Sequence, residues 1–285
     1  MTTWRELLDE AAGVLGSKLD ARRLVEEASG LEGAELVLAL DDTVPARSGA
    51  YLTRMVERRV AGEPLQYVIG RWGFRRLDLM VDRRVLIPRP ETEQVVDWAL
   101  DEARALHCSE LAVADLGTGS GAIALSLAVE LGPDVTEVWA TDVSADALDV
   151  TQANLAGIGT WAAPRVRVAE GSWWAALPET LAGRLHVVVS NPPYVADHEP
   201  LPSEIESFEP ALALRGGRDG LDAIRTIVAG APRWLGRPGV LVVELAPGQA
   251  GAAVELARAA GAARAEIRTD LAGRDRALVA AWEAA

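Results

Sequence analysis

The stretch that decides the fold lies at residues 112–130 and reads AVADLGTGSGAIALSLAVE. A short apolar run with one acid, Asp115, predicts a buried strand, and the apolar segment that follows Gly121 predicts a helix. Gly117, Gly119 and Gly121 separate the two, and glycine allows the close ligand approach of a strand–turn–helix cradle. Their Gly-x-Gly-x-Gly spacing departs from the Gly-x-Gly-x-x-Gly of dinucleotide-binding loops, which points away from a pyrophosphate ligand.

Helical and extended patterns alternate from Val95 onward, which predicts a doubly wound α/β fold with a mostly parallel sheet. A last pair of extended segments, 265–269 and 277–282, predicts an antiparallel edge. The other expected strands are 112–116, 138–142, 165–169, 185–190 and 240–245, and the expected helices are 121–131, 144–156, 219–235 and 248–260.

The N-terminal part has a different pattern. Residues 1–62 read as short amphipathic helices, with Trp4, Leu7, Leu8, Ala11 and Leu15 at the spacing of one helical face. Apolar residues come closer to alternating between Gln66 and Ile87, which predicts a hairpin. We therefore expect a helical domain at 1–65, a hairpin linker at 66–90 and an α/β domain at 91–285.

Composition narrows the class of protein. Apolar residues make up 49% of the chain and charged residues 25%, as in globular proteins with a real core. The single cysteine, Cys108, excludes an intramolecular disulfide framework, and the amino terminus has no apolar stretch of signal-peptide type. No apolar run approaches the roughly 18–20 residues that span a bilayer. These features predict a cytoplasmic enzyme with no membrane partner.

The formal charge of −14 counts against an enzyme of duplex DNA, which would be expected to carry a broad basic face. We expect no direct sequence-specific binding of nucleic acid. The charge is uneven, because residues 47–89 hold ten arginines against four acids, a local charge of +6. Two interpretations of this segment stay open: a solvated face, or a surface that contacts an acidic protein or a nucleic acid.

The glycine loop and its flanks predict a cofactor. Preceded by Asp115, the loop resembles motif I of the class I S-adenosylmethionine methyltransferases, in which an acid at the end of the next strand accepts hydrogen bonds from ribose hydroxyls. Asp142 lies 25 residues after Gly117, at the end of the next predicted strand. The resemblance implies that S-adenosyl-L-methionine is bound by Gly117, Thr118, Gly119, Ser120, Gly121 and Asp142. Asp142 could instead be a helix N-terminal acid ahead of Ser144.

A second motif, Asn191-Pro192-Pro193-Tyr194, follows the predicted strand 185–190. An amide or aromatic amine nitrogen is a poor nucleophile, so a methyltransferase must aim its lone pair at the methyl group. The Asn191 side-chain oxygen and the Pro192 carbonyl can each accept a hydrogen bond from a planar NH2 group. The prolines keep that carbonyl rigid, and Tyr194 can stack on the planar group. No tuned general base is needed, because orientation and electrostatics carry the rate.

This second motif gives the type of reaction but not the substrate. Enzymes that methylate adenine N6, cytosine N4 and glutamine amides all resemble it. The purely structural interpretation of the motif is that the strand ends in a proline turn and the asparagine caps it.

Other segments narrow the substrate. Residues Pro88-Arg-Pro-Glu-Thr-Glu93 resemble a segment of the bacterial peptide-chain release factor N5-glutamine methyltransferases, and so do 64–70, 208–221 and 270–276. The resemblance runs from about residue 50 to the end. It implies a Rossmann-like class I methyltransferase fold with an antiparallel C-terminal edge, a small N-terminal helical domain and a hairpin linker.

The resemblance also implies partners and roles. Class 1 release factors would be the substrates, methylated on the glutamine of their Gly-Gly-Gln loop, and the helical domain would help to dock them. Trp173 would lie beside the adenine, and Asn191 would also contact the cofactor. Asn191, Pro192, Pro193 and Tyr194 would hold the glutamine amide, with Asn191, Pro192 and Tyr194 as the catalytic set, and Pro88 to Thr92 would border the pocket.

Two departures from the family pattern are visible. Ser172 stands where the family usually has an acid before the aromatic, and either Trp173 or Trp174 could contact the adenine. Residues 245–248, Leu-Ala-Pro-Gly, replace a glycine-containing turn of the family. His107, His186 and His198 have no metal-ligand spacing, and no metal is expected.

Four other functions compete. An adenine-N6 DNA methyltransferase shares the Asn191 motif but would need a DNA-recognition region and a cationic cleft. A glutamine methyltransferase of a ribosomal protein and a specialised paralogue with a small-molecule or peptide substrate would keep the same chemistry. The fourth is a scaffold that binds the cofactor without catalysis, and the intact Asn191 argues against it.

Overall fold

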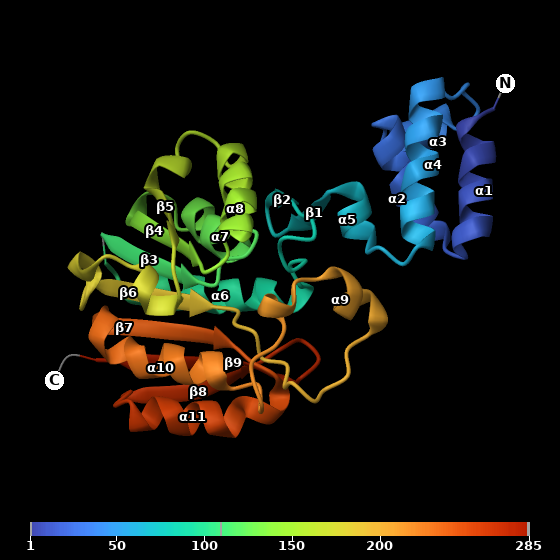
Figure 1. The fold of residues 1–285 in the computed structure, drawn as a ribbon. Helices are drawn as coiled ribbons and strands as arrows, with labels where there is room; N and C mark the ends of the chain where they lie inside the picture. Colours follow the sequence, from blue (N-terminus) through green and yellow to red (C-terminus); the bar gives the residue numbers. More distant parts are fainter. Residues whose placement is uncertain (1, 109, 284–285) are drawn as a thin grey trace. The chain divides into compact units, whose positions relative to one another are not determined.

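The computed structural model describes residues 2–108 and 110–283. The chain divides into two units (Figure 1). The first contains the residues up to Arg71 together with Ser203–Phe208, and the second contains Trp72–Pro202 and the chain from Glu209 onward. The segment 66–90, expected as a linker, is divided between them. Among the described residues, no helix is both long and apolar enough to cross a bilayer.

The first unit is helical, as the amphipathic patterns predicted. Trp4, Leu24, Leu36, Leu52 and Met55 are buried together at its centre. Thr3 begins the first helix with a capping box, because its hydroxyl accepts from the Glu6 N–H and the Glu6 carboxylate accepts from the Thr3 N–H. The helices are α1 Trp4–Leu15, α2 Lys18–Ser29, α3 Gly33–Ala39, α4 Ala46–Val60, α5 Leu65–Ile69 and α9 Ser203–Phe208.

Most of the arginines in residues 47–89 form ion pairs within their own unit. In the first unit, Arg58 pairs with Glu63, Arg59 with Asp20 and Glu204, and Arg71 with Glu27 and Glu32. In the second, Arg75 pairs with Glu130 and Asp97, Arg84 with Asp82, and Arg89 with Glu209. At least six of the ten arginines thus have a carboxylate partner, and the local +6 charge is largely neutralised.

The second unit is built on a seven-stranded sheet in the order β5-β4-β3-β6-β7-β9-β8. Neighbouring strands run parallel except for β9, which is antiparallel to both β7 and β8. The predicted α/β fold with an antiparallel C-terminal edge is confirmed. The strands are β3 Leu111–Leu116, β4 Val135–Asp142, β5 Val166–Glu170, β6 Leu185–Ser190, β7 Leu235–Glu244, β8 Arg264–Thr269 and β9 Asp275–Trp282.

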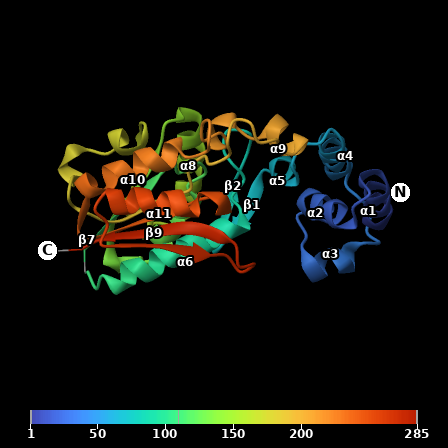
Figure 2. The same ribbon diagram turned by 90° about the horizontal axis from the view of Figure 1, so that it is seen from below.

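Helices cover both faces of this sheet (Figure 2). Alternate residues of one strand enter different cores: Val113 packs with α6 and α7, whereas Ala112 and Ala114 pack with α10 and α11. Successive side chains of a strand point to opposite faces of the sheet, and here both faces are buried. The strands are therefore continuous apolar runs in the sequence. The helices are α6 Pro90–Ala105, α7 Ala122–Glu130, α8 Ala145–Gly157, α10 Asp222–Trp234 and α11 Ala250–Ala259.

The predicted hairpin is formed by β1 Arg71–Phe74 and β2 Leu77–Met80, which make a separate two-stranded sheet. Helices α5, α6 and α9 and several short 3-10 turns were not among the predicted elements, and α5 occupies the start of the segment 66–87 that was expected to be extended. The turns are η1 Gly132–Asp134, η2 Ala163–Arg165, η3 Trp173–Ala176, η4 Glu179–Leu181, η5 Ala211–Ala213 and η6 Pro247–Gln249.

The order of the strands determines where a ligand site is expected. β3 lies between β4 and β6, so the chain leaves β3 in one direction along the sheet and returns on its other side at β6. In such sheets, ligands bind at the carboxyl ends of the strands where the order reverses. The glycine loop follows β3 and Asn191 follows β6, so the two motifs meet at this point.

Candidate active site

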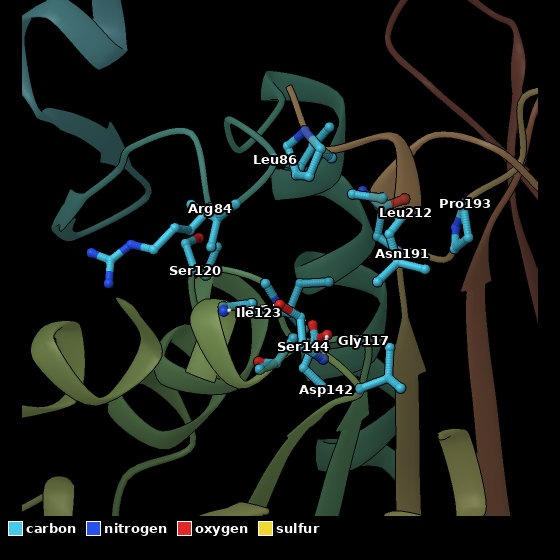
Figure 3. A pocket seen from close by; sticks show the side chains of 18 of the residues that line it. Arg84, Leu86, Gly117, Ser120, Ile123, Asp142, Ser144, Asn191, Pro193 and Leu212 are labelled. Carbon is cyan, nitrogen blue, oxygen red and sulfur yellow. Dashed lines mark hydrogen bonds between the residues drawn. The ribbon is translucent and has the colours of Figure 1, made fainter. Parts of the chain in front are cut away.

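A cavity of about 340 Å³ lies at the carboxyl ends of β3, β4 and β6, within the range of small-molecule sites. Figure 3 shows Asn191 and Pro193 on one side of it and Arg84 and Ser120 on the other. Its lining comes from six short segments of the second unit: 84–92, 117–123, 142–147, 171–173, 191–193 and 210–215.

The three glycines of the loop have the backbone conformation that requires glycine. Gly117, Gly119 and Gly121 have φ angles of 80°, 56° and 84°. The N–H groups of Gly117 and Thr118 both donate to the Thr141 carbonyl at 2.8 Å, and that of Gly121 donates to the Thr118 carbonyl. The loop therefore uses these N–H groups to hold its own shape and does not offer them to a phosphate. This agrees with the ligand class that the glycine spacing indicated.

Three polar side chains support the loop, and two of them, Thr151 and Asn154, were not predicted from the sequence. Thr151 donates its hydroxyl to the Gly119 carbonyl at 2.8 Å, and Asn154 donates to the Ser120 carbonyl at 2.8 Å and to the Met80 carbonyl at 3.0 Å. Asp115 accepts from the Thr118 hydroxyl at 2.7 Å. Thr151 and Asn154 lie one turn apart on α8, where i, i+3 spacing was the only available signal.

Asp115 is fully buried, and one of its carboxylate oxygens, Oδ1, has no hydrogen-bond partner within residues 2–108 and 110–283. Desolvation raises its pKa to about 7, and the hydrogen bonds from Thr118 and the Ala124 N–H oppose this shift. The carboxyl group lies directly beneath the loop, and its role in the structure is to fix Thr118.

Asp142 ends β4 and lines the cavity. Its Oδ2 atom accepts from the Gly119 N–H at 2.9 Å, and its Oδ1 atom accepts from the Ser144 N–H at 3.0 Å. Ser144, and not Asp142, is the N-cap of α8. Each carboxylate oxygen can accept a further hydrogen bond, so Asp142 joins the loop to the strand end and still has acceptor sites for a ligand.

The two neighbouring tryptophans have different environments. Trp173 lines the cavity, and its ring packs so closely on Gly117 that a Cβ atom there would lie 3.3 Å from it. Its φ angle of 49° is unusual for a bulky residue. Trp174 is buried, stacks on Trp234 with ring centroids 6.0 Å apart, and donates to the Ile227 carbonyl. Trp173 is therefore the tryptophan available to a ligand.

The Asn191-Pro192-Pro193-Tyr194 motif follows β6, but its residues do not all face the cavity. Asn191 and Pro193 line it, whereas Pro192 is buried and Tyr194 lies behind the lining. Burial raises the pKa of Tyr194 well above its usual range, and its hydroxyl donates to Glu244 Oε1 at 3.4 Å. Gly220 packs on this backbone, because a Cβ atom there would meet the Tyr194 carbonyl. The segment is thus held rigidly from behind.

Two segments that border the cavity are tied together by Glu209. Its buried carboxylate pairs with Arg89 at 2.6 Å and accepts from the Ile87 N–H at 3.3 Å. Pro88 and Thr92 lie in one of these segments and line the cavity, with Pro210 and Leu212 in the other. Glu209 and Arg89, which both lie in segments that resemble one family, are therefore paired in the fold.

Glu244, the last residue of β7, is fully buried behind Thr92. Its Oε2 atom accepts from the Thr92 hydroxyl at 2.7 Å, and Thr92 accepts in turn from the Asn191 side-chain amide at 3.2 Å. Desolvation raises the pKa of Glu244 to about 7, against the hydrogen bond from Thr92 and the charge of Arg276. Sequence reasoning did not identify Glu244 as a functional residue, because a single acid at a strand end has no distinctive spacing.

Two family models match different parts of the chain. A family model of the PrmC N-terminal domain matches residues 2–70, and one of the methyltransferase small domain matches 100–208. A solved methyltransferase from Pyrococcus furiosus shares the fold, with a TM-score of 0.53 at 16% identity over 73% of this chain and 90% of that one.

Closer relatives are found among curated proteins. The release factor glutamine methyltransferase of Burkholderia pseudomallei is 44% identical over 91% of this chain and 90% of its own length. That of Moorella thermoacetica is 41% identical over 98% of both chains. With this identity along nearly its whole length, the chain belongs to the release factor glutamine methyltransferase family.

Proposed function

We propose that this protein transfers a methyl group from S-adenosyl-L-methionine to the side-chain amide nitrogen, N5, of the glutamine in the Gly-Gly-Gln motif of class 1 peptide-chain release factors. The observation that carries the proposal is that the glycine loop and Asn191 line one and the same cavity. Membership of the family supplies the class of acceptor. Because release factors act on ribosomes, we expect the reaction to take place in the cytoplasm.

The cofactor half of the cavity fits S-adenosyl-L-methionine, which supplies an electrophilic methyl group on a sulfonium. Gly117 to Gly121 would border its amino-acid part, without the free N–H cradle that a phosphate would need. Asp142 has remaining lone pairs for ribose hydroxyls, and the Trp173 ring offers a flat face for adenine. Asn191 lines the same cavity and would stand between cofactor and acceptor.

The acceptor half fits a planar amide. Asn191 Oδ1 would accept one N–H of the glutamine side chain and the Pro192 carbonyl the other, which aims the nitrogen lone pair. Pro193, Pro88 and Thr92 line that half of the cavity and would exclude water from the amide. Tyr194 is tied through its hydroxyl to Glu244, so its contribution to binding would come from its ring and backbone. The proton can leave the nitrogen after transfer, so no general base is required.

The helical domain is proposed to help dock the protein substrate, with residues 1–65 as the docking domain, 66–90 as a hairpin linker and 91–285 as the methyltransferase domain. The match of residues 2–70 to a domain model of this family supports the separate role. Because most arginines of 47–89 have carboxylate partners, docking would depend on shape more than on a continuous basic face.

The experiment that tests the function offers the protein several acceptors with labelled cofactor: a class 1 release factor, a ribosomal protein fraction and plasmid DNA. Peptide mass spectrometry then locates the methyl group. The proposal expects one added methyl on the glutamine of Gly-Gly-Gln and none on DNA. Label in DNA or in a ribosomal protein, with an unmodified release factor, would overturn it in favour of the corresponding alternative.

A further inference from the structure

A chain of three hydrogen bonds runs from the cavity into the protein interior. The Asn191 amide nitrogen donates to the Thr92 hydroxyl at 3.2 Å, the Thr92 hydroxyl donates to Glu244 Oε2 at 2.7 Å, and the Tyr194 hydroxyl donates to Glu244 Oε1 at 3.4 Å. Thr92 is 3% exposed and Glu244 is 0% exposed, so water does not compete for the bond between them.

The fold brings these four residues together from three elements. Ser190 at the end of β6 pairs with Val243 of β7, so Asn191 and Glu244 are the next residues on two adjacent strands. Thr92 lies in the first turn of α6 and stands between their side chains. The junction is therefore part of the rigid core of the second unit and not of a mobile loop.

The direction of each bond follows from chemistry. An ionised Glu244 can only accept, so the single hydroxyl proton of Thr92 must go to Glu244. The Thr92 oxygen is then only an acceptor toward Asn191, and it selects the NH2 side of that amide. If the Asn191 amide were reversed, two acceptor oxygens would face each other and a buried hydrogen bond would be lost.

We propose that Thr92 and Glu244 are positioning residues that hold the Asn191 side chain with its oxygen toward the glutamine amide of the substrate. The inference rests on the proposed function, because that amide needs an oxygen here to accept a hydrogen bond from its N–H. Glu244 touches no reacting atom, and acts through Thr92 and Asn191. Its other oxygen holds the Tyr194 hydroxyl, so one carboxylate orders both ends of the Asn191–Tyr194 segment.

The protonation state of Glu244 controls which way the hydrogen bonds from Asn191 through Thr92 to Glu244 run. A protonated Glu244 can donate to the Thr92 oxygen, which frees the Thr92 proton to bond the Asn191 oxygen and lets the amide turn its NH2 group to the cavity. The charged and titratable groups around Glu244 are Arg276, which is paired with Asp270, together with Glu91, Tyr194 and, beside Tyr194, Arg89. Arginine and tyrosine keep one charge state between pH 5 and 9, and Glu244 is the carboxyl group that bonds to Thr92, so its protonation would reverse the hydrogen bonds in that interval.

The inference predicts a specific pattern in single-turnover methylation of an intact release factor. Thr92→Val keeps the shape but removes the hydroxyl, and should slow transfer roughly 10- to 100-fold with little change in KM or in cofactor affinity. Thr92→Ser restores the hydroxyl and should recover most of the rate. Thr136→Val is the matched control, because it removes a hydroxyl that donates to the Leu111 carbonyl at the opposite end of the sheet.

Glu244→Gln separates positioning from simple packing. The wild-type rate should fall as pH falls through about 7, whereas Glu244→Gln should be several-fold slower at pH 8 and should fall less with pH, since Asp115 beneath the loop is present in both proteins. A Thr92→Val rate equal to that of the wild type, or an acidic limb in Glu244→Gln as large as that of the wild type, would overturn the inference. A wild-type protein that methylates no release factor would instead overturn the proposed function.

A readout without substrate tests the chain directly. In the 15N-labelled full-length protein, the Asn191 side-chain NH2 signals, assigned by their loss in Asn191→Ala, should shift in Thr92→Val. They should also titrate with pH in the wild type but not in Glu244→Gln. Signals that are indifferent to both substitutions would show that the hydrogen-bond chain does not orient Asn191.

Discussion

Gly119 and Asp142 are joined by a hydrogen bond of 2.9 Å, in which the backbone N–H of the glycine loop donates to the carboxylate at the end of the neighbouring strand. The residue that we expect to hold the ribose therefore also holds the loop. Cofactor affinity and loop order are linked through one side chain.

The first prediction concerns this link. Asp142→Ala removes the acceptor for ribose hydroxyls, so it should weaken binding of S-adenosyl-L-methionine by roughly 1.5–3 kcal/mol. Isothermal titration calorimetry measures the affinity, and thermal unfolding of the cofactor-free protein measures the separate loss of the bonds to Gly119 and Ser144. Unchanged affinity would remove Asp142 from the cofactor site.

The two adjacent tryptophans should respond differently to truncation. Trp174→Ala removes a buried ring that stacks on Trp234, and should cost roughly 3–5 kcal/mol of stability. Trp173→Ala removes a ring that lines the cavity, and should lower cofactor affinity with a smaller effect on stability. Denaturant unfolding and calorimetry on both variants check this. The reverse pattern would assign the adenine contact to Trp174.

The fold was largely predictable because its signals are local. Strands buried on both faces produce apolar runs such as 185–190, whose predicted bounds agree with β6. The role of Glu244 was not predictable, because it depends on Thr92 packing against a residue that lies 152 positions away. The partial burial of Tyr194 and the choice between Trp173 and Trp174 also depend on tertiary packing. The ion pairs of Arg59 and Arg89 likewise join residues far apart in sequence, so the charge count alone overstated the basic character of 47–89.

Salt provides a test of substrate docking. If arginines of 47–89 contact the substrate, higher ionic strength should weaken binding of an intact release factor more than turnover of a short Gly-Gly-Gln peptide. Because at least six of the ten arginines are already paired, we expect a modest difference. If salt affects the two substrates equally, these arginines form a solvated face and do not contact the substrate.

The buried Glu244 predicts a pH dependence of stability. Burial raises its pKa in the folded protein to about 7, so between about pH 4.5 and 7 the folded state keeps a proton that the unfolded chain releases. Stability from this group is therefore lost as pH rises across that interval and is constant above it. Relative to Glu244→Gln, the wild type should lose about 1–3 kcal/mol of unfolding free energy between pH 5 and pH 8.

Urea unfolding followed by tryptophan fluorescence measures this difference, because eight of the nine tryptophans lie in the second unit. Asp115 titrates in the same direction and is present in both proteins, so its contribution cancels in the comparison. A difference between the two proteins that is constant with pH would show that Glu244 is ionised in the fold throughout.

The central claim is that Asn191 aims a glutamine amide at the methyl group, and the most direct measurement is single-turnover methylation of a release factor by Asn191→Ala, with cofactor affinity measured on the same protein. The account predicts that transfer falls by orders of magnitude while the cofactor still binds, because a misdirected lone pair loses the orientation that drives the reaction. Methyl transfer by Asn191→Ala at a rate close to that of the wild type would contradict it.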